Sequence, residues 1–454
     1  MNTPICDFVR DYARSDALRL HMPGHKGTSF LGFEALDITE FEGADSLYEA
    51  DGIILESEKN ASDLFGCPTF YSTEGSSQCI RAMLYLTMLY ARKLGRAPLI
   101  AAGRNVHRTF LSGAALLDLD VDWLCPKVSE SYLSCHLTAE EVEDYLTVAN
   151  RLPVAVYLTS PDYLGDIPDL AGIAQVCHRH GVLLLVDNAH GAYLRFLRPS
   201  RHPMDLGVDL CCDSAHKTLP VVTGGAYLHV SAQSDPLFLS EAKQALLLFG
   251  STSPSYLILQ SLDKANPYLQ DYSRLLEQFL PAVDRLKEDL ADHGYSLYGQ
   301  ERLKITLETK SYGYTGRDFA AILSAENMYC EFCDPDYVVL MLTPETGDQG
   351  LARLREKLLS VPKRPPIVRH PPVFHQGVRR LSIRQALFSL SETIAVDACE
   401  GRILAAATVG CPPAVPILIC GEEIDRHTIS CFRYYGITAC SVVKNTAAES
   451  FCAG

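Results

Sequence analysis

Short continuous apolar runs, several of them followed by polar clusters, are the main pattern of residues 56–290. The expected strands are 98–103, 154–158, 182–186 and 206–212. The expected helices lie between residues 74 and 94 and between residues 169 and 181, where hydrophobic positions have helical spacing. Apolar strands that alternate with helices in this way predict an α/β fold, in which helices cover both faces of a mostly parallel sheet.

The pattern becomes mixed further along the chain. Helical spacing at 272–293 and a strand-like run at 303–307 are typical of a smaller α+β domain. Residues 363–380, rich in proline and basic side chains, read as an exposed linker, and a last segment begins as a helix at Leu381 and becomes turn-rich at 410–416. The expected parts are an N-terminal segment 1–55, a large domain 56–290, a small α+β domain 291–365 and a C-terminal domain 366–454.

Composition narrows the class of protein. Of 454 residues 47% are hydrophobic, and the formal charge of -15 argues against a nucleic-acid or anionic-membrane partner. No apolar run reaches the ~20 residues that cross a bilayer, and the N-terminus lacks a signal pattern. Sixteen cysteines without such a signal predict a reducing, cytoplasmic location. Pairs such as Cys211-Cys212 lack the spacing of a metal site, so no metal is expected.

A lysine directly follows one of the expected strands. Lys217 stands in the segment Ser214-Ala-His-Lys-Thr218, just beyond the strand that is expected to end at Cys212. Burial at such a place lowers the pKa of an amine and frees the amine to attack a carbonyl carbon. Most lysines are solvated surface charges, so Lys217 alone does not identify a site.

A carboxylate at the end of another expected strand changes that interpretation. Asp187 follows the run 182–186 and opens the segment Asp187-Asn-Ala-His190. A carboxylate at this place could keep the nitrogen of a pyridine ring protonated, which makes the ring an electron sink. The alternative is an aspartate that caps the following helix. Asp187 and Lys217 together favour pyridoxal phosphate as a cofactor, held by Lys217 as a Schiff base.

Two further motifs fit the same cofactor. Gly75, Ser76 and Ser77 precede a helical run, and the N–H groups at a helix N-terminus are well suited to bind phosphate. Plain N-capping by serine is the alternative. His107 follows the strand 98–103 and could stack on a pyridine ring, although a lone histidine is more often a hydrogen-bonded loop residue. These polar clusters follow the expected strands, and ligands of open α/β sheets bind at the carboxyl ends of strands.

The order of these motifs resembles that of the fold-type I pyridoxal-phosphate enzymes, and specifically of the ornithine/lysine/arginine decarboxylase family. Residues 20–27 (LHMPGHKG) resemble the N-terminal signature of that family, and the acidic segment 37–47 resembles the element that follows it. Residues 251–256 (STSPSY) and 381–423 resemble segments beyond the lysine and in the C-terminal domain of the family. The resemblance covers nearly the whole chain and implies the compact form of the family, without the extra N-terminal domain of the larger enzymes.

The resemblance implies a role for each candidate residue. Lys217 would bind the cofactor, Asp187 would pair with its ring nitrogen and His107 would stack on its ring. The phosphate would be bound by Gly75, Ser76 and Ser77. Further cofactor contacts would come from His190, Ser214, His216 and Thr252, the last across a dimer interface. The resemblance also implies a homodimer whose active sites lie between the subunits, with a contribution from the N-terminal segment.

The implied reaction is decarboxylation of a basic amino acid to an amine and carbon dioxide. His216 or Lys217 would protonate the substrate carbon after the carboxylate leaves. A distal ammonium or guanidinium needs an acidic partner, and Glu40, Glu42 and Asp45 are candidates for substrate binding. Each of these three could instead be a solvated or capping charge.

Departures from the family pattern leave the substrate open among arginine, lysine and ornithine. Asp162 stands where threonine is usual, Thr223 where glutamine is common, and residues 411–416 replace a more aromatic, glycine-bearing turn. Another fold-type I reaction (aminotransfer, aldol cleavage or β-elimination) would use the same lysine and aspartate. A catalytically silent regulatory homologue is the alternative from a different class, but such a protein has no need of Lys217, Asp187 and His107 together.

Overall fold

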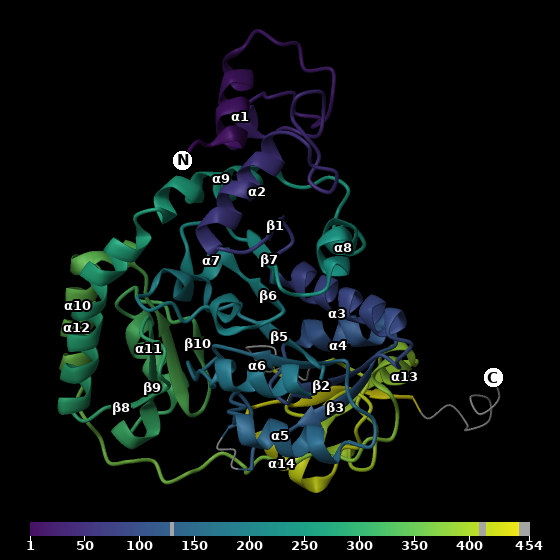
Figure 1. Cartoon of the computed structure of the whole chain (residues 1–454). Helices are drawn as coiled ribbons and strands as arrows, with labels where there is room; N and C mark the ends of the chain where they lie inside the picture. The colour runs from purple at the N-terminus through teal and green to yellow at the C-terminus, as the bar shows by residue number, and fades with distance from the viewer. Residues whose placement is uncertain (128–130, 408–414, 445–454) are drawn as a thin grey trace.

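The computed structural model describes residues 1–127, 131–407 and 415–444. Its largest sheet has seven strands in the order β1-β7-β6-β5-β4-β2-β3 (Figure 1). The strands are β1 Thr69–Ser72, β2 Leu99–Gly103, β3 Asp120–Leu124, β4 Ala155–Thr159, β5 Leu183–Asp187, β6 Leu210–Asp213 and β7 Ala226–Val230. Strands β2 to β6 pair in parallel, whereas β7 and β1 are antiparallel to their neighbours. The predicted mostly parallel sheet is confirmed.

Successive residues of the central strands face opposite layers of helices. Tyr157 and Leu185 belong to the core that contains α3 and α4, whereas Val156 and Leu184 belong to the core that contains α5 and α6. The helices around the sheet are α3 Ser76–Lys93, α4 Arg108–Leu117, α5 Ala139–Val148, α6 Leu170–Arg179, α7 Ala215–Thr218, α8 Pro236–Leu247 and α9 Tyr256–Leu269. Because both faces of the sheet are covered, its inner strands β4, β5 and β6 are apolar up to their last residue, which is polar in each.

One expected strand begins later than its sequence indicated. Pro203–Leu206 forms a short 3-10 helix, and Gly207 follows it with a φ of 89°. This left-handed turn redirects the chain, so β6 begins only at Leu210. The sequence pattern also did not indicate β3, which lies at the edge of the sheet and alternates polar and apolar residues from Asp120 onward.

A separate antiparallel sheet has the strand order β10-β11-β9-β8. Its strands are β8 Ser296–Tyr298, β9 Lys304–Glu308, β10 Phe332–Cys333 and β11 Tyr337–Met341. The helices of this part are α10 Tyr272–Asp292, α11 Gly316–Ser324 and α12 Gly347–Ser360, and α10 lies beside α12 (Figure 1). The expected helix at 272–293 and the expected strand at 303–307 are confirmed to within one residue.

The two ends of the chain pack against the large sheet from different sides (Figure 1). The N-terminal part contains α1 Pro4–Arg14, η1 Glu34–Leu36 and α2 Ile53–Phe65, and α1 and α2 contact α9. The C-terminal part contains α13 Ile383–Phe388, β12 Ser391–Ala395, α14 Arg426–Tyr434 and β13 Ala439–Val443. Residues 362–378 form neither helix nor strand, and most of the turn-rich segment 410–416 lies outside the described residues. None of the described helices is long and apolar enough to cross a membrane.

Candidate active site

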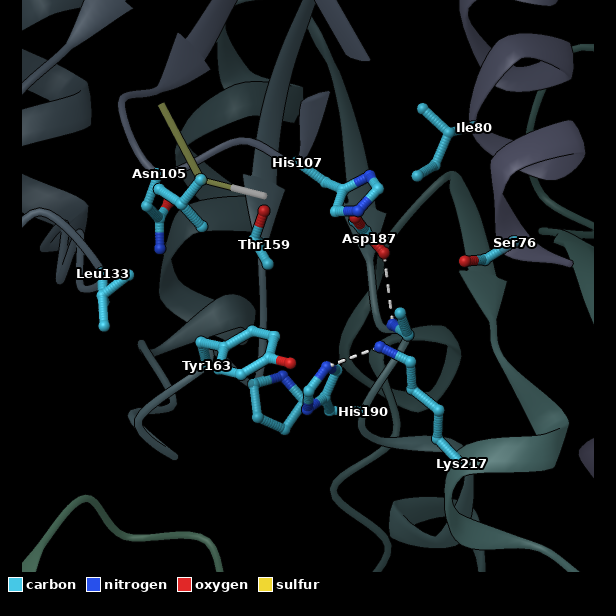
Figure 2. A pocket seen from close by; sticks show the side chains of 13 residues that line it. Ser76, Ile80, Asn105, His107, Leu133, Thr159, Tyr163, Asp187, His190 and Lys217 are labelled. Atoms are coloured by element: carbon cyan, nitrogen blue, oxygen red, sulfur yellow. Dashed lines mark hydrogen bonds between the residues drawn. The ribbon is translucent and has the colours of Figure 1, made fainter. Parts of the chain in front are cut away.

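A cavity of about 160 Å³ lies at the carboxyl ends of β2, β4 and β5, beside α7 (Figure 2). It is lined by Ser76, Ile80, Asn105, His107, Leu133, Thr159, Pro161, Tyr163, Asp187, Ala189, His190, Lys217 and Val415. Five of the residues predicted from the sequence therefore line one cavity. Those five are Ser76, His107, Asp187, His190 and Lys217.

Lys217 enters the cavity from the short helix α7, which follows β6 after one residue. Its Nζ lies 2.8 Å from Nε2 of His190 (Figure 2). Burial lowers the pKa of Lys217, against the opposing charges of Glu331 and Asp187. A larger share of this amine is therefore uncharged and able to react with a carbonyl carbon than at an exposed lysine.

Asp187 is the last residue of β5 and is only 2% exposed. Its Oδ1 accepts hydrogen bonds from the backbone N–H of Ala189 at 3.2 Å and from the thiol of Cys212 at 3.6 Å. Burial raises the pKa of Asp187, although the charge of Lys217 opposes that rise. Neither hydrogen-bond donor is a cation, so a protonated pyridine nitrogen would complete the surroundings of this buried carboxylate.

The start of α3 has the features of a phosphate site. Gly75 has a φ of 71°, and no side chain caps the first turn of the helix that follows it. The hydroxyl of Ser214 donates to Oγ of Ser76 at 2.7 Å, and Oγ of Ser77 lies 3.2 Å from Oγ1 of Thr109. These hydroxyls and the free end of the helix are chemically suited to an anion.

His107 caps the N-terminus of α4 and lines the cavity. Its Nδ1 accepts the backbone N–H of Thr109 at 3.2 Å. Burial, followed by the charge of Lys217, lowers the pKa of His107 to about 4, so the ring is neutral at physiological pH. Burial also lowers the pKa of His216, whose Nδ1 lies 3.1 Å from the carbonyl oxygen of Gly225. A neutral flat ring beside Asp187 suits a position over a pyridine ring (Figure 2).

The other predicted residues do not line this cavity. Thr252 is exposed, as is Glu42. The carboxylate of Asp45 accepts the backbone N–H groups of Gly52 and Ile54, at 3.0 and 2.8 Å, ahead of α2. Glu40 likewise accepts the hydroxyl of Ser46 at 3.0 Å and the N–H of Leu47 at 3.2 Å. A role of Thr252, Glu40, Glu42 and Asp45 in the site stays a prediction.

Tyr163, which lines the cavity, and its hydrogen-bond partner Glu331 were not among the predicted site residues. The ring of Tyr163 lies edge-on to His190 with 4.9 Å between ring centroids, and its hydroxyl donates to Oε1 of Glu331 at 3.1 Å. The charge of Glu331 also acts on Lys217 and His216. Tyr163 ends the polar cluster after β4 and could have been suspected, but Glu331 comes from the other sheet and has no local signal.

The residues around the cavity fit pyridoxal phosphate. They offer an amine with a lowered pKa, a buried carboxylate without a cationic hydrogen-bond partner, a neutral ring and an anion-binding helix end. Together with the sheet, these groups define a fold-type I enzyme that depends on pyridoxal phosphate.

The chain belongs to the Orn/Lys/Arg decarboxylase family, and it is a decarboxylase. The family model "Orn/Lys/Arg decarboxylase, major domain" matches residues 3–305, and the model of the C-terminal domain matches residues 381–443. These matches confirm the resemblance to this family that was inferred from the sequence motifs.

Relatives of similar length match nearly the whole chain, and a solved structure shares its fold. The uncharacterised protein YaaO of Bacillus subtilis is 28% identical over 94% of this chain and 93% of its own length. An arginine decarboxylase of the same organism is 27% identical over 94% and 92%. The fold is similar to that of the Francisella novicida lysine decarboxylase, with a TM-score of 0.79, 15% identity and 97% and 81% of the two chains covered.

Proposed function

We propose that this chain removes the α-carboxylate of arginine, lysine or ornithine as carbon dioxide and releases the corresponding amine of polyamine metabolism. The observation that carries the proposal is one cavity in which Lys217 and Asp187 lie together with His107 and the start of α3. Membership of a decarboxylase family supports this reaction over other fold-type I reactions. The name of the Bacillus subtilis arginine decarboxylase makes arginine the first substrate to test.

Pyridoxal phosphate, when bound, supplies a ring that accepts the electron pair left behind when the carboxylate departs. Lys217 Nζ would hold the cofactor, and the carboxylate of Asp187 would keep a proton on the ring nitrogen. The hydroxyls of Ser76, Ser77 and Ser214 and the N-terminus of α3 would bind the phosphate, with Gly75 and His216 close to them. His107 and His190 would contact the ring.

The walls of the cavity would favour loss of a carboxylate. Ile80, Leu133 and Val415 exclude water from part of the site, and a carboxylate that is poorly solvated is lost more readily. After carbon dioxide leaves, Lys217 or His216 would give a proton to the α-carbon. Burial lowers the pKa of both groups, so the proton donor stays open between Lys217 and His216.

A basic substrate also needs a carboxylate for its distal cation. Glu331, which accepts a hydrogen bond from the cavity-lining Tyr163, is one candidate of this chain. Glu40, Glu42 and Asp45 are the candidates of the N-terminal segment, and we propose that they and Thr252 would act across the interface of a homodimer. A guanidinium would favour a bidentate contact with such a carboxylate.

The first experiment is an assay of the holoenzyme with L-arginine, L-lysine and L-ornithine, with amine products identified by mass spectrometry. We expect agmatine, cadaverine or putrescine from the wild type and a rate at least about 1,000-fold lower from Lys217→Ala, because a nucleophile of this kind has no substitute in the cavity. Lys127→Ala, at a lysine whose side chain is 69% exposed, is the control and should keep the full rate. A keto acid in place of an amine, or full activity of Lys217→Ala, would overturn the proposal.

A further inference from the structure

A buried ion pair of the second sheet approaches the cavity from behind His190. Lys304, the first residue of β9, places Nζ 3.0 Å from Oε2 of Glu301, and both side chains are only 1% exposed. Burying two charges is costly unless further polar contacts compensate them. The further polar contacts of Lys304 therefore indicate what compensates the burial of this ion pair and what the pair does beside the cavity.

Lys304 connects this pair to the reactive lysine through one imidazole. Its Nζ donates to the backbone carbonyl of Asp162 at 3.0 Å and lies 3.2 Å from Nδ1 of His190. Nε2 of the same ring lies 2.8 Å from Nζ of Lys217. The three side chains thus form a continuous polar chain, Lys304–His190–Lys217, that runs from the second sheet into the cavity.

With Lys304 as the ammonium that is paired with Glu301, the donors and acceptors along this chain allow one arrangement of protons. An ammonium carries three N–H donors and no acceptor, so Nδ1 of His190 must accept from Lys304. Burial lowers the pKa of His190 well below its usual value, so the ring carries a single proton. That proton is therefore on Nε2 and points at Lys217, which has to accept it with a lone pair.

We propose that Lys304, held by Glu301, is a positioning residue that fixes the proton of His190 on Nε2 and thereby keeps Lys217 as an uncharged amine. An ammonium at Lys217 would face the N–H of His190 with no acceptor between them. The proposal rests on the assignment of Lys217 as the reactive lysine, and its test does not depend on turnover.

Other charges face the same three groups. The groups whose charges act on Lys217 include Glu331, Asp187, Lys304 and Cys212. His107 and His216 act on His190 in addition to the two lysines. Asp162 is buried, and burial raises its pKa to about 6 while the charge of Lys304 opposes that rise. Among these groups Lys304 combines a positive charge with a direct contact to the ring of His190, so it is the one to change.

The first test is the position of the proton on His190 in the full-length wild type without cofactor. Proteins labelled with ¹⁵N-histidine would be compared by NMR at pH 8, with His190→Gln to assign the signal. The proposal expects a protonated Nε2 and an unprotonated Nδ1. A proton on Nδ1 would overturn the proposal without any need for a lysine variant.

The second test measures how fast Lys217 reacts with an amine-modifying reagent as a function of pH, by peptide mass spectrometry. Lys304→Met should move the midpoint for Lys217 upward by about one pH unit, so that labelling at pH 8 is about tenfold slower, with an unchanged plateau at high pH. Lys304→Arg keeps the charge and should retain the midpoint of the wild type. Lys310→Met is the matched control, because Lys310 is also a buried lysine of the second sheet's region, paired with Asp336 at 2.6 Å.

These outcomes separate positioning from mere structural support. A structural role would change the plateau, which reports access to Lys217, and Lys310→Met would then behave like Lys304→Met. An unchanged midpoint in folded Lys304→Met would overturn the proposal. If the holoenzyme produced no amine but the proton lay on Nε2 and the midpoint moved, the proposed reaction would fail and this inference would stand.

Discussion

Asp213, the last residue of β6, holds a buried network behind Lys217. Its Oδ2 accepts from Nε2 of His202 at 3.0 Å and from Nε2 of His229 at 3.1 Å, and its Oδ1 accepts the amide of Asn188 at 2.6 Å. Asn188 directly follows Asp187, so one carboxylate ties together the two strand ends that carry the site. The ligand atoms of His202, Cys211 and Asp213 lie close enough together to hold a metal ion. In this structure both His202 and Cys211 form hydrogen bonds with the carboxylate of Asp213 instead.

The charges of this network make stability depend on pH. Burial alone would raise the pKa of Asp213, but His202 and His229 hold it well below its usual value. Burial alone would lower the pKa of His229, but Asp213 raises it. The lowered pKa of Asp213 stabilises the fold above about pH 4, and this stabilisation is lost as the pH falls through the pKa of the folded state. The raised pKa of His229 stabilises the fold below about pH 6.5, and this stabilisation is lost as the pH rises through the pKa of the folded state.

We expect Asp213→Asn to lower the free energy of unfolding by about 3 kcal/mol at pH 6, because it leaves two buried imidazoles without their anion. Urea denaturation at pH 6 and at pH 3 measures the effect. It should be smaller at pH 3, because Asp213 of the unfolded wild type takes up a proton below about pH 4 and part of the stabilisation is lost. Asp205→Asn is the control, since the ion pair of Asp205 with Arg195 is partly exposed and is worth at most about 1 kcal/mol. Equal losses for Asp213→Asn at both pH values would contradict the electrostatic account.

At the scale of elements, the start of α3 is fixed by two loops that approach each other closely. The N–H of Gly75 donates to the carbonyl oxygen of Gly224 at 2.8 Å. Gly224 has a φ of 100°, and a Cβ on it would come within 3.1 Å of the carbonyl oxygen of Thr73. The loop after β1 and the loop before β7 therefore lie together, which brings Ser76 beside Ser214.

Replacing both of these serines should weaken cofactor binding. A hydrogen bond to a charged group contributes about 1.5–3 kcal/mol, so the double variant Ser76→Ala/Ser214→Ala should raise the Kd for pyridoxal phosphate at least about tenfold. Equilibrium dialysis measures the Kd, and Ser240→Ala at the exposed surface of α8 should leave it unchanged. If the double variant bound pyridoxal phosphate with the Kd of the wild type, the proposal that the phosphate binds at the start of α3 would be wrong.

The elements that the sequence predicted well are those whose burial is uniform along their length. Strands β4 and β5 are apolar up to their last residue because helices cover both of their faces, and Asp187 is conspicuous as the charged end of such a run. β3 escaped prediction because it lies at the edge of the sheet. The start of β6 was placed too early because the turn at Gly207 depends on backbone conformation more than on hydrophobicity.

At the scale of the whole molecule, the site combines residues that no local pattern relates. Lys217 and Asp187 follow neighbouring strands, so the sheet alone predicts their proximity. Lys304 and Glu331 come from the second sheet and Val415 from the C-terminal part, and their approach depends on how these parts pack. Sequence reasoning therefore found five residues that line the cavity and missed the groups that approach it from other parts of the chain.

Arg104 joins the large sheet to the C-terminal part of the chain. It follows β2 directly and donates to the carbonyl oxygens of Pro416 at 2.8 Å and Ile417 at 3.1 Å. Its guanidinium also lies 3.7 Å from Oε2 of Glu422, and the two side chains are only 4% and 3% exposed. Val415, which directly precedes Pro416, lines the cavity, so Arg104 holds one wall of the site in place.

We expect Arg104→Met to loosen this wall and to lower the rate of decarboxylation. Removing one partner of a buried ion pair costs about 3–5 kcal/mol because the remaining charge is left uncompensated, and burial already raises the pKa of Glu422. Hydrogen exchange should therefore become faster in peptides that cover 415–424 while α6 keeps its protection.

The double variant Arg104→Met/Glu422→Gln also removes the uncompensated charge of Glu422 and should recover part of the stability. It does not restore the two hydrogen bonds to the backbone carbonyls, so residues 415–424 should still exchange faster than in the wild type. Unchanged exchange at 415–424 in Arg104→Met would mean that packing of α13 on α4, rather than Arg104, holds the C-terminal part against the site.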